Sequence, residues 1–354
     1  MSQKMRCYCV TKHNEPLVAV DTETPTLEGT QVLVKVTRAG ICHTDLHLWE
    51  GSYNLGGGKR LDISDRGIDL PLTLGHEIAG EVVAVGPDAG ASVVGTTCVV
   101  HPWLGCGECD TCQRGQENIC LKSASIGVFR PGGYSEYVVV PDPKFCVDIG
   151  DIDPSQAALL ACSGVTTYSA IRKFGEVLKD VPLVIIGAGG LGFMALSIVQ
   201  AMGFKGAIMV DLDQTKRDEA IRAGALAAID SGADDAAEQI IAATGGGAMA
   251  VLDLVGAEAT TSLAIASVAR GAHIVICGLY GGELVVPLPY IPMRPLHIQG
   301  SWVGNLAELR ELIGLVRDRG LRTVPVVERP LETAFDSLMD LKQGRLLGRV
   351  VLVP

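Results

Sequence analysis

The sequence is short of basic residues and has no long charged tail. Lys and Arg number 29 against 40 Asp and Glu, which gives a formal net charge of −11. A protein of this charge is poorly suited to bind a phosphate backbone, so we expect no nucleic-acid partner. The first ten residues, MSQKMRCYCV, contain no apolar run of signal-peptide length, so we expect a cytoplasmic protein.

Long uncharged runs are also scarce, and only residues 181–204 are long enough to suggest a membrane span. This run divides into an apolar strand, VPLVIIG, a glycine-rich turn, GAGGLG, and a helical segment, LGFMALSIVQAM. A strand, a turn and a helix in this order are typical of an α/β unit of a globular protein. We therefore expect no membrane contact.

The composition is that of a globular α/β protein. With 354 residues the chain is long enough for two domains, each with its own core. Hydrophobic residues make up 48% and there are 43 glycines, which indicates many tight turns. The first 150 residues are β-rich, because QVLVKVTRAG, EIAGEVVAVG and SEYVVVP are β-branched runs bounded by Gly or Pro.

The pattern changes near residue 155. A helix is predicted to begin at Asp153 or Ser155, and strands then alternate with helices, which predicts a parallel sheet covered on both faces. The predicted strands are 183–186, 207–211, 226–229, 250–254 and 273–277, and the predicted helices lie near 190–203, 214–223, 235–243 and 260–269. After Pro295 a helix, LAELRELIGLVRDRG, and a final strand, RVVLVP, follow.

Four cysteines crowd into the stretch GCGECDTCQRGQENIC. They are Cys106, Cys109, Cys112 and Cys120. A total of 11 cysteines in a chain without a secretion signal argues against a disulfide framework. Short Cys-x-x-Cys steps favour zinc held by four thiolates, with an iron–sulfur cluster or a redox dithiol as the alternatives. Four thiolates leave zinc no open position, so we interpret this site as structural.

The turn Gly187-Ala188-Gly189-Gly190-Leu191-Gly192 has the form G-x-G-x-x-G. It follows an apolar strand and opens a helix, which is the context in which this motif binds a dinucleotide. Asp211 ends the next predicted strand, where a carboxylate would accept a hydrogen bond from the adenosine ribose and repel a 2′-phosphate. The sequence therefore favours NAD over NADP, although Lys216 and Arg217 lie near.

A second group of possible ligands and proton carriers lies in GICHTDLHLWEG and LGHEIAGE. These are Cys42, His43, Asp45, His47, His76 and Glu77. A lone histidine is usually structural, and spacing alone does not bring Cys42 and His76 together.

The chain resembles the zinc-dependent medium-chain alcohol dehydrogenases of the bacterial and archaeal secondary-alcohol type. The resemblance covers nearly the whole chain and rests on GICHTDLH, LPLTLGHEIAGEV, the four-cysteine stretch, ACSGVTTYSA, VIIGAGGLG and GRVVLVP. It implies a GroES-like catalytic domain built from residues 1–161 and 300–354 and a Rossmann NAD-binding domain built from 162–299. It also implies a homo-oligomer, a tetramer rather than a dimer.

By this resemblance, Cys42, His76 and Cys162 bind a catalytic zinc with Glu77 nearby, and the four-cysteine lobe binds a structural zinc far from the reaction. Thr44 and His47 correspond to the hydroxyl and imidazole of a proton relay, and Asp45 to a carboxylate that orients a ligand. Further residues correspond to cofactor contacts. They are Thr166, His43, Arg349, Lys216 and the turn with Gly190 and Leu191.

Trp103 and Trp302 correspond to substrate-pocket positions, and two indoles predict an apolar pocket for a medium-sized secondary, cyclic or aryl alcohol or ketone. Residues 54–71 are predicted to form an extended, mobile or interface-forming loop. Its Lys59, Arg60 and Arg66 are either solvated charges or contacts for an anionic substrate group. The alternative functions are a polyol or sugar dehydrogenase and a non-catalytic NAD-binding protein.

Overall fold

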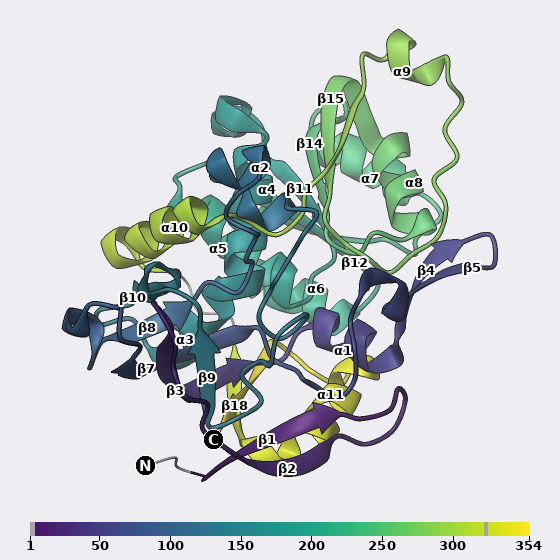
Figure 1. Ribbon diagram of the computed structural model, residues 1–354. Coiled ribbons are helices and arrows are strands. Elements are labelled where there is room, and N and C mark those ends of the chain that lie inside the picture. Colours follow the sequence, from purple (N-terminus) through teal and green to yellow (C-terminus); the bar gives the residue numbers. More distant parts are fainter. Residues whose placement is uncertain (1–3, 322–324) are drawn as a thin grey trace.

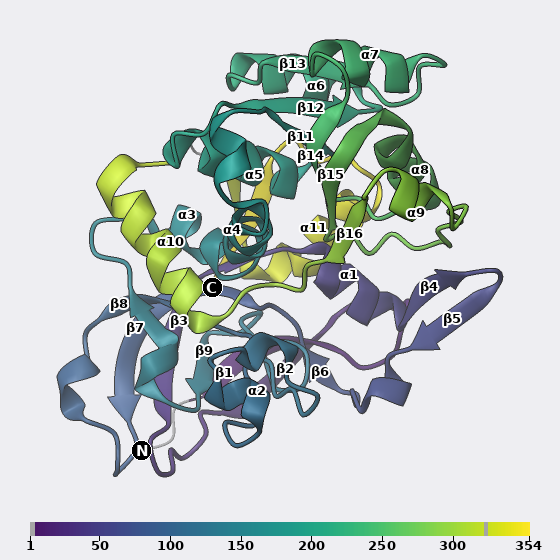
Figure 2. The ribbon, with the colours of Figure 1, turned by 90° about the horizontal axis from the view of Figure 1, so that it is seen from above.

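The structure, a computed structural model, describes residues 4–321 and 325–354. It contains a β-rich unit and a parallel-sheet unit, with helices packed around and between them (Figure 1). Seen from above, the two units form two lobes, and α4 (Val165–Arg172) and α10 (Leu306–Arg319) lie where they meet (Figure 2).

The β-rich unit is built on a seven-stranded sheet of order β10-β8-β7-β3-β18-β17, with β9 also paired to β3. Its strands are β3 (Val32–Gly40), β7 (Glu77–Val85), β8 (Thr97–Val100), β9 (Tyr137–Val140), β10 (Cys146–Asp148), β17 (Val326–Pro330) and β18 (Arg349–Val353). A smaller sheet combines β1 (Lys4–Val10), β2 (Val18–Glu23) and β6 (Leu72–Thr73).

The carboxyl end of the chain returns to this first sheet. Strand β18 pairs antiparallel with β3, where Val351 is opposite Gly40. Residues from both ends of the chain therefore share one sheet, while the predicted domain boundaries at 161/162 and 299/300 stay predictions.

The parallel-sheet unit has the strand order β13-β12-β11-β14-β15-β16, and every neighbouring pair is parallel. Its strands are β11 (Leu183–Ile186), β12 (Ala207–Asp211), β13 (Ala227–Asp230), β14 (Ala248–Asp253), β15 (Val268–Ile276) and β16 (His297–Gly300). Numbered from β11, this is the order 3-2-1-4-5-6 of the Rossmann fold. The α/β prediction is confirmed.

The predicted alternation of strands and helices is also confirmed, with small shifts at the ends. The helices that follow the strands are α5 (Gly190–Ala201), α6 (Gln214–Arg222), α7 (Ala236–Ala243) and α8 (Glu258–Ser267). The largest difference is β15, which begins at Val268 rather than at 273 because Val268 pairs with Ala248 across an irregular register. The uncharged run 181–204 forms β11 and α5, and no described helix is long and apolar enough to cross a membrane.

Alternate side chains of the central strands enter two different cores. Leu183 and Ile185 face a large cluster shared with the β-rich unit, whereas Val184 and Ile186 face a second, smaller cluster. This two-sided burial explains why the strands read as continuous apolar runs. The remaining α-helices of the described residues are α1 (His43–Glu50), α2 (Asp110–Gln113), α3 (Pro154–Leu159), α9 (Tyr290–Met293) and α11 (Ala334–Lys342).

The predicted extended loop at 54–71 is wrong, because much of it is folded. Strands β4 (Ser52–Gly56) and β5 (Lys59–Asp62) form a hairpin that projects from the β-rich unit (Figure 1). At its tip Gly57 and Gly58 both have positive φ, 55° and 77°, which is the backbone of a two-residue hairpin turn. The glycine run therefore marks a tight turn rather than a mobile excursion.

Candidate active site

Two strand ends of the β-rich sheet bring Cys42 and His76 together. Strand β3 ends at Gly40 and Cys42 precedes α1, while His76 directly precedes β7. Gly40 is paired with Glu77, so the two segments leave the sheet side by side. This pairing between strands distant in sequence is what spacing alone does not reveal.

Cys162 reaches the same point from a π-helical turn, Leu160–Gly164, that links α3 to α4. The donor atoms of Cys42, His76 and Cys162 all lie within 4.8 Å of one another, and all three residues are buried. The two sulfurs are 3.9 Å apart. Tetrahedral zinc with bonds near 2.3 Å would place two sulfurs about 3.8 Å apart. His76 Nε2 is buried without a hydrogen-bond partner, so the three side chains fit a metal ion.

The Asp45 carboxylate contacts both segments of this site, the one that carries Cys42 and the one that carries His76. Its Oδ2 accepts hydrogen bonds from the Cys42 backbone N–H and the Tyr134 hydroxyl, each at 3.0 Å. Its Oδ1 accepts from the Gly75 N–H at 3.1 Å and lies 3.2 Å from His76 Nδ1. A carboxylate beside one ring nitrogen orients the imidazole and leaves the other nitrogen for a metal.

Glu77 and Arg349 form a buried ion pair behind the site. The other oxygen of Glu77 accepts a hydrogen bond from the Ser163 N–H at 3.2 Å, and Arg349 also donates to the Ile41 carbonyl at 2.8 Å. Burial raises the pKa of Glu77 to about 7, and the Arg349 charge acts in the opposite direction. Because Gly40 has no side chain, Glu77 can occupy the space beside it.

The glycine turn has the three properties that a pyrophosphate site needs. Gly187 has a φ of 102°, which allows the tight turn, and a side chain at Gly192 would collide with the Gly187 carbonyl. Around the Cβ position of Gly189 there is open space, so a ligand can approach the backbone there. Gly190 begins α5 and lies against the Arg349 side chain, which therefore contacts both this turn and Glu77.

Asp211 ends β12 next to this turn. Its Oδ2 accepts a hydrogen bond from the Ala188 N–H at 2.7 Å, and its Oδ1 accepts from the Asp213 N–H at 2.9 Å. A carboxylate has about four acceptor sites, so capacity remains for a ribose hydroxyl.

A cleft of about 550 Å³ connects the cysteines to the glycine turn. Many of the predicted site residues line it. They are Cys42, His43, Thr44, His47, Trp103, Cys162, Thr166, Gly187, Gly189, Gly190, Leu191, Gly192, Asp211, Lys216 and Trp302. Asp45, His76, Glu77 and Arg349 do not line the cleft and are buried behind it.

The polar lining near the cysteines is sparse. Thr44 Oγ1 lies 4.0 Å from Cys42 Sγ, and the buried Thr166 hydroxyl has no hydrogen-bond partner. Trp103 is fixed by a hydrogen bond of 3.0 Å from its ring nitrogen to the Ala161 carbonyl, and its ring centroid is 5.2 Å from that of His76. Trp302 also lines the cleft and is 40% exposed.

Sequence reasoning missed several lining residues. Tyr53 follows α1, and its ring centroid lies 4.8 Å from that of His47. Phe129 and Tyr280 also line the cleft, as does Arg66, which the sequence offered only as one of three possible contacts for an anionic group. The glycine pair at the hairpin tip was a usable signal, because a hairpin between 52 and 62 places Tyr53 on a strand next to α1.

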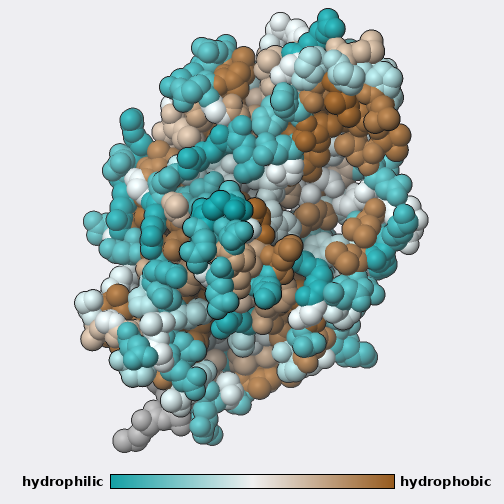
Figure 3. All heavy atoms as spheres, turned by 45° about the horizontal axis from the view of Figure 1, so that its top comes forward, coloured by the Kyte–Doolittle hydropathy of each residue, from teal (hydrophilic) through white to brown (hydrophobic). Residues whose placement is uncertain are grey.

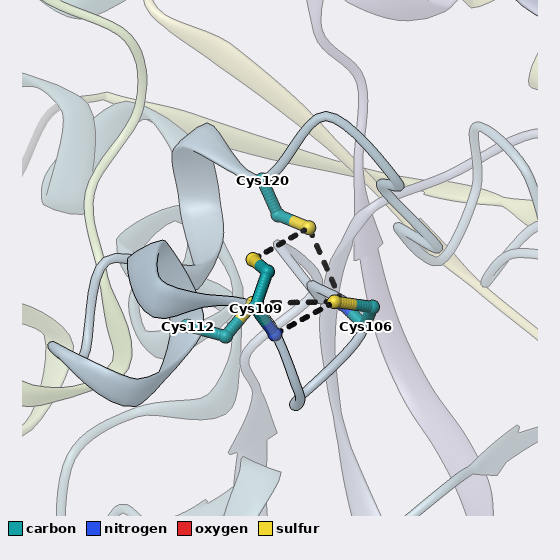
Figure 4. A group of neighbouring side chains, drawn as sticks. All are labelled: Cys106, Cys109, Cys112 and Cys120. Atoms are coloured by element: carbon teal, nitrogen blue, oxygen red, sulfur yellow. Dashed lines mark hydrogen bonds between the residues drawn. The ribbon is translucent and has the colours of Figure 1, made fainter.

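The four clustered cysteines form a second candidate metal centre (Figure 4). Cys106 Sγ and Cys112 Sγ are 4.0 Å apart, and Cys109 Sγ and Cys120 Sγ are 3.8 Å apart. Backbone N–H groups of Cys109 and Lys122 donate to two of the sulfurs, as is expected for thiolates. All 11 cysteines lie in described residues and none forms a disulfide, so the cluster fits a structural zinc.

This lobe borders the cleft, while its expected distance from the reaction stays a prediction. Asn118, Ile119 and Cys120 line the cleft. The Asn118 amide donates to the Trp302 carbonyl at 2.9 Å, and Glu117 accepts from the Leu306 N–H at 3.0 Å. The lobe thus holds the segment that carries Trp302.

Comparison with known proteins gives a consistent picture. The Alcohol dehydrogenase GroES-like domain family matches residues 28–151, and the Zinc-binding dehydrogenase family matches residues 190–318. An NAD-dependent alcohol dehydrogenase of Sulfurisphaera tokodaii is 36% identical over 99% of this chain and 100% of its own length. A D-arabinose 1-dehydrogenase (NADP(+)) of Saccharolobus solfataricus is 31% identical over 99% of this chain and 98% of its own.

Among solved structures, the alcohol dehydrogenase of Aeropyrum pernix matches this fold with a TM-score of 0.89. The two sequences are 31% identical, and the match covers 99% of this chain and 100% of that chain. Fold, metal-binding geometry and these full-length similarities agree with one another. The chain belongs to the family of zinc-dependent medium-chain alcohol dehydrogenases.

Proposed function

We propose that this protein is an NAD-dependent zinc alcohol dehydrogenase that interconverts a medium-sized secondary alcohol, cyclic or aryl, and its ketone. The observation that carries the proposal is the shared cleft, which joins the Cys42–His76–Cys162 cluster to the Gly187–Gly192 turn. The cluster would hold the catalytic zinc and the four-cysteine lobe the structural one.

Zinc bound to Cys42, His76 and Cys162 would supply a Lewis acid that lowers the pKa of an alcohol hydroxyl and polarises a ketone carbonyl. Thr44 and His47 are three residues apart on α1, on one helix face, and both line the cleft. The Thr44 hydroxyl can accept a proton from the substrate hydroxyl while donating its own, and His47, whose pKa is lowered by burial, can pass the proton to water. Asp45 holds the orientation of His76, and Glu77 lies behind the metal site.

The glycine turn, the amino terminus of α5 and Arg349 would bind the dinucleotide pyrophosphate. Asp211 would accept a hydrogen bond from the adenosine ribose, with Lys216 beside it, which favours NAD over NADP. His43 would lie near the pyrophosphate and Thr166 would face the nicotinamide. The free hydroxyl of Thr166 supports this assignment.

The substrate class follows from the walls of the cleft. Trp103, Trp302, Tyr53 and Phe129 leave few polar groups to satisfy the hydroxyls of a sugar. This lining favours a ketone reductase over a polyol or sugar dehydrogenase, the class to which the Saccharolobus relative belongs by name. A non-catalytic NAD-binding protein would not need Thr44, His47 and a three-ligand metal site in one cleft.

We also propose a cytoplasmic homo-oligomer, a tetramer rather than a dimer. Strand β16 is at the edge of the parallel sheet and is exposed along its length. The chain around it carries the exposed large side chains of Tyr280, Val285, Leu288, Tyr290, Met293 and Ile298. An apolar cluster is visible on the upper part of the surface (Figure 3). A second copy of the chain would cover this edge, and light scattering of the purified protein tests it.

A screen of alcohols with NAD and ketones with NADH, read by NADH fluorescence, tests the activity. We expect turnover of uncharged cyclic or aryl secondary alcohols, and none by Cys42→Ser, which should still bind NADH because the glycine turn is unchanged. Full activity of Cys42→Ser would contradict the proposal.

A further inference from the structure

Arg66 is a cation in the wall of the active-site cleft that the proposed mechanism does not use. Among the described lining residues, Lys and Arg contribute only Arg66 and Lys216, and Asp and Glu contribute only Asp211. Asp211 ends β12 and Lys216 lies on α6, at the end of the cleft that the proposed function assigns to adenosine. Arg66 instead lies 5.7 Å from the ring centre of Tyr53, which contacts His47. The charge therefore stands at the reacting end of the cleft.

The backbone holds Arg66 in place. It ends a short 3₁₀ helix, Ser64–Arg66, that is flanked by Ile63 and Ile68, both of which are buried. The Ile63 N–H donates to the Gly51 carbonyl at 3.0 Å, which fixes this helix to the end of α1. A side chain on such a frame is presented to the cleft with less freedom than one on an open loop.

The other two cations of this segment are differently placed. Arg60 donates from its guanidinium to the Ser52 hydroxyl across the hairpin, and neither Arg60 nor Lys59 lines the cleft. Arg66 has no carboxylate partner among the described residues, although the chain has a large excess of acidic groups.

Its neighbour Tyr53 is a buried phenol. Burial raises the pKa of Tyr53 and the Arg66 charge opposes this, so the phenol stays neutral and can donate a second hydrogen bond.

We propose that Arg66, together with the Tyr53 hydroxyl, forms a subsite for a carboxylate on the substrate, so that the preferred substrates are keto acids and hydroxy acids whose acid group lies on the ring or chain away from the reacting carbon. This inference deepens the proposed function and rests on it. A guanidinium that has no carboxylate partner in a largely apolar cleft can bind a substrate carboxylate through charge-assisted hydrogen bonds. A dinucleotide phosphate is the other candidate anion, but the proposed function assigns that group to the glycine turn and the amino terminus of α5.

The test compares matched acids and neutral analogues on the zinc-loaded enzyme. Reduction of 3- and 4-acetylbenzoate with NADH is measured beside 3- and 4-methylacetophenone. We expect kcat/KM for the preferred acid to exceed that of its neutral analogue by about tenfold, the size expected for one charge-assisted hydrogen bond. Arg66→Gln should remove this preference, so that kcat/KM for the acid falls to the level measured with its neutral analogue in the same variant. Arg66→Lys should restore part of it, and Lys59→Gln should leave it intact.

A binding measurement separates this inference from the proposed function. Calorimetric titration of the NADH complex with 3- and 4-carbamoylbenzoate, against the methylbenzamides, does not require turnover. Tighter binding of the acid that is lost in Arg66→Gln supports the subsite even if no ketone is reduced, in which case the proposed function alone fails. Equal binding of acid and neutral compound, or an acid preference that survives in Arg66→Gln, overturns the subsite. A weaker affinity of Arg66→Gln for NADH with no change in acid preference would assign Arg66 to the dinucleotide and also overturn it.

Discussion

Single side chains decide how the two ends of the cleft differ. Both carboxylate oxygens of Asp45 contact groups that hold the metal site. These groups belong to Cys42, Gly75, Tyr134 and His76. Asp211 also accepts two backbone hydrogen bonds, but it lines the cleft and can accept more. The first carboxylate is a positioning residue, and the second can contact a cofactor.

Asp211→Asn should change the preference for the cofactor. The amide keeps the shape of the side chain but loses the charge that repels a 2′-phosphate and strengthens a hydrogen bond to ribose. We expect the affinity for NADH to fall about tenfold, the affinity for NADPH to fall less, and the ratio of the two to narrow. Fluorescence titration measures both. Asp218→Asn on exposed α6 is the control, and an equal loss for both cofactors would remove the specificity argument.

At the scale of elements, features contained in short stretches of sequence could be predicted, whereas contacts between distant segments could not. The glycine turn and the four cysteines lie within short stretches, so their spacing carries their function. The alternating strands and helices were recognised because the central strands are buried on both faces. Cys42, His76 and Cys162 meet only because β3 pairs with β7 and α3 packs on both, and the resemblance to a family supplied what the spacing could not.

The hairpin β4–β5 was missed because its glycine run was interpreted as flexibility. In the fold it reaches across to the parallel-sheet unit, where Gly56 faces Gly282 and Glu283 and Gly281 faces Asn54. Contact between glycines brings the two backbones close together, which a loop prediction does not anticipate. The same error hid Tyr53.

Gly281→Ala should loosen this contact. Gly281 has a φ of 106°, and a Cβ there would lie 2.8 Å from the Asn54 Cβ and collide with its carbonyl oxygen. We expect a loss of about 1–3 kcal/mol in the free energy of unfolding, measured in urea, with faster proteolysis of the hairpin. Gly271→Ala is the matched control, since Gly271 has a φ of 79° but open space around it. Equal effects of the two substitutions would mean that backbone strain alone is responsible.

Asn118→Ala should alter the cleft without removing zinc. It deletes the hydrogen bond from the cysteine lobe to the Trp302 carbonyl, so the Trp302 wall is held less firmly. We expect KM for bulky ketones to rise about fivefold, as for the loss of one hydrogen bond of about 1 kcal/mol, while the zinc content stays constant. Gln113→Ala deletes a bond within the lobe, to the Gly107 carbonyl, and should leave KM unchanged. If both variants behave alike, the link to Trp302 has no effect on substrate binding.

For the whole molecule, the important feature is that two sheets of different kinds face one cleft. The antiparallel sheet brings the metal ligands to its edge, and the parallel sheet presents the glycine turn and Asp211 at the carboxyl ends of its strands. Strand β18 returns to β3, so Arg349 reaches from the first sheet to Gly190 of the second unit. One residue near the carboxyl end therefore contacts both halves of the site.

The central claim is that a zinc ion held by Cys42, His76 and Cys162 performs the chemistry while a second one only supports the fold. The most direct measurement is the zinc content per chain together with turnover, for the native protein, Cys162→Ser and Cys109→Ser. The account predicts two zinc ions in the native chain, in line with its two clusters, and one in Cys162→Ser, which should retain NADH binding but lose turnover. A Cys162→Ser protein that keeps both zinc ions and its full activity would contradict the account.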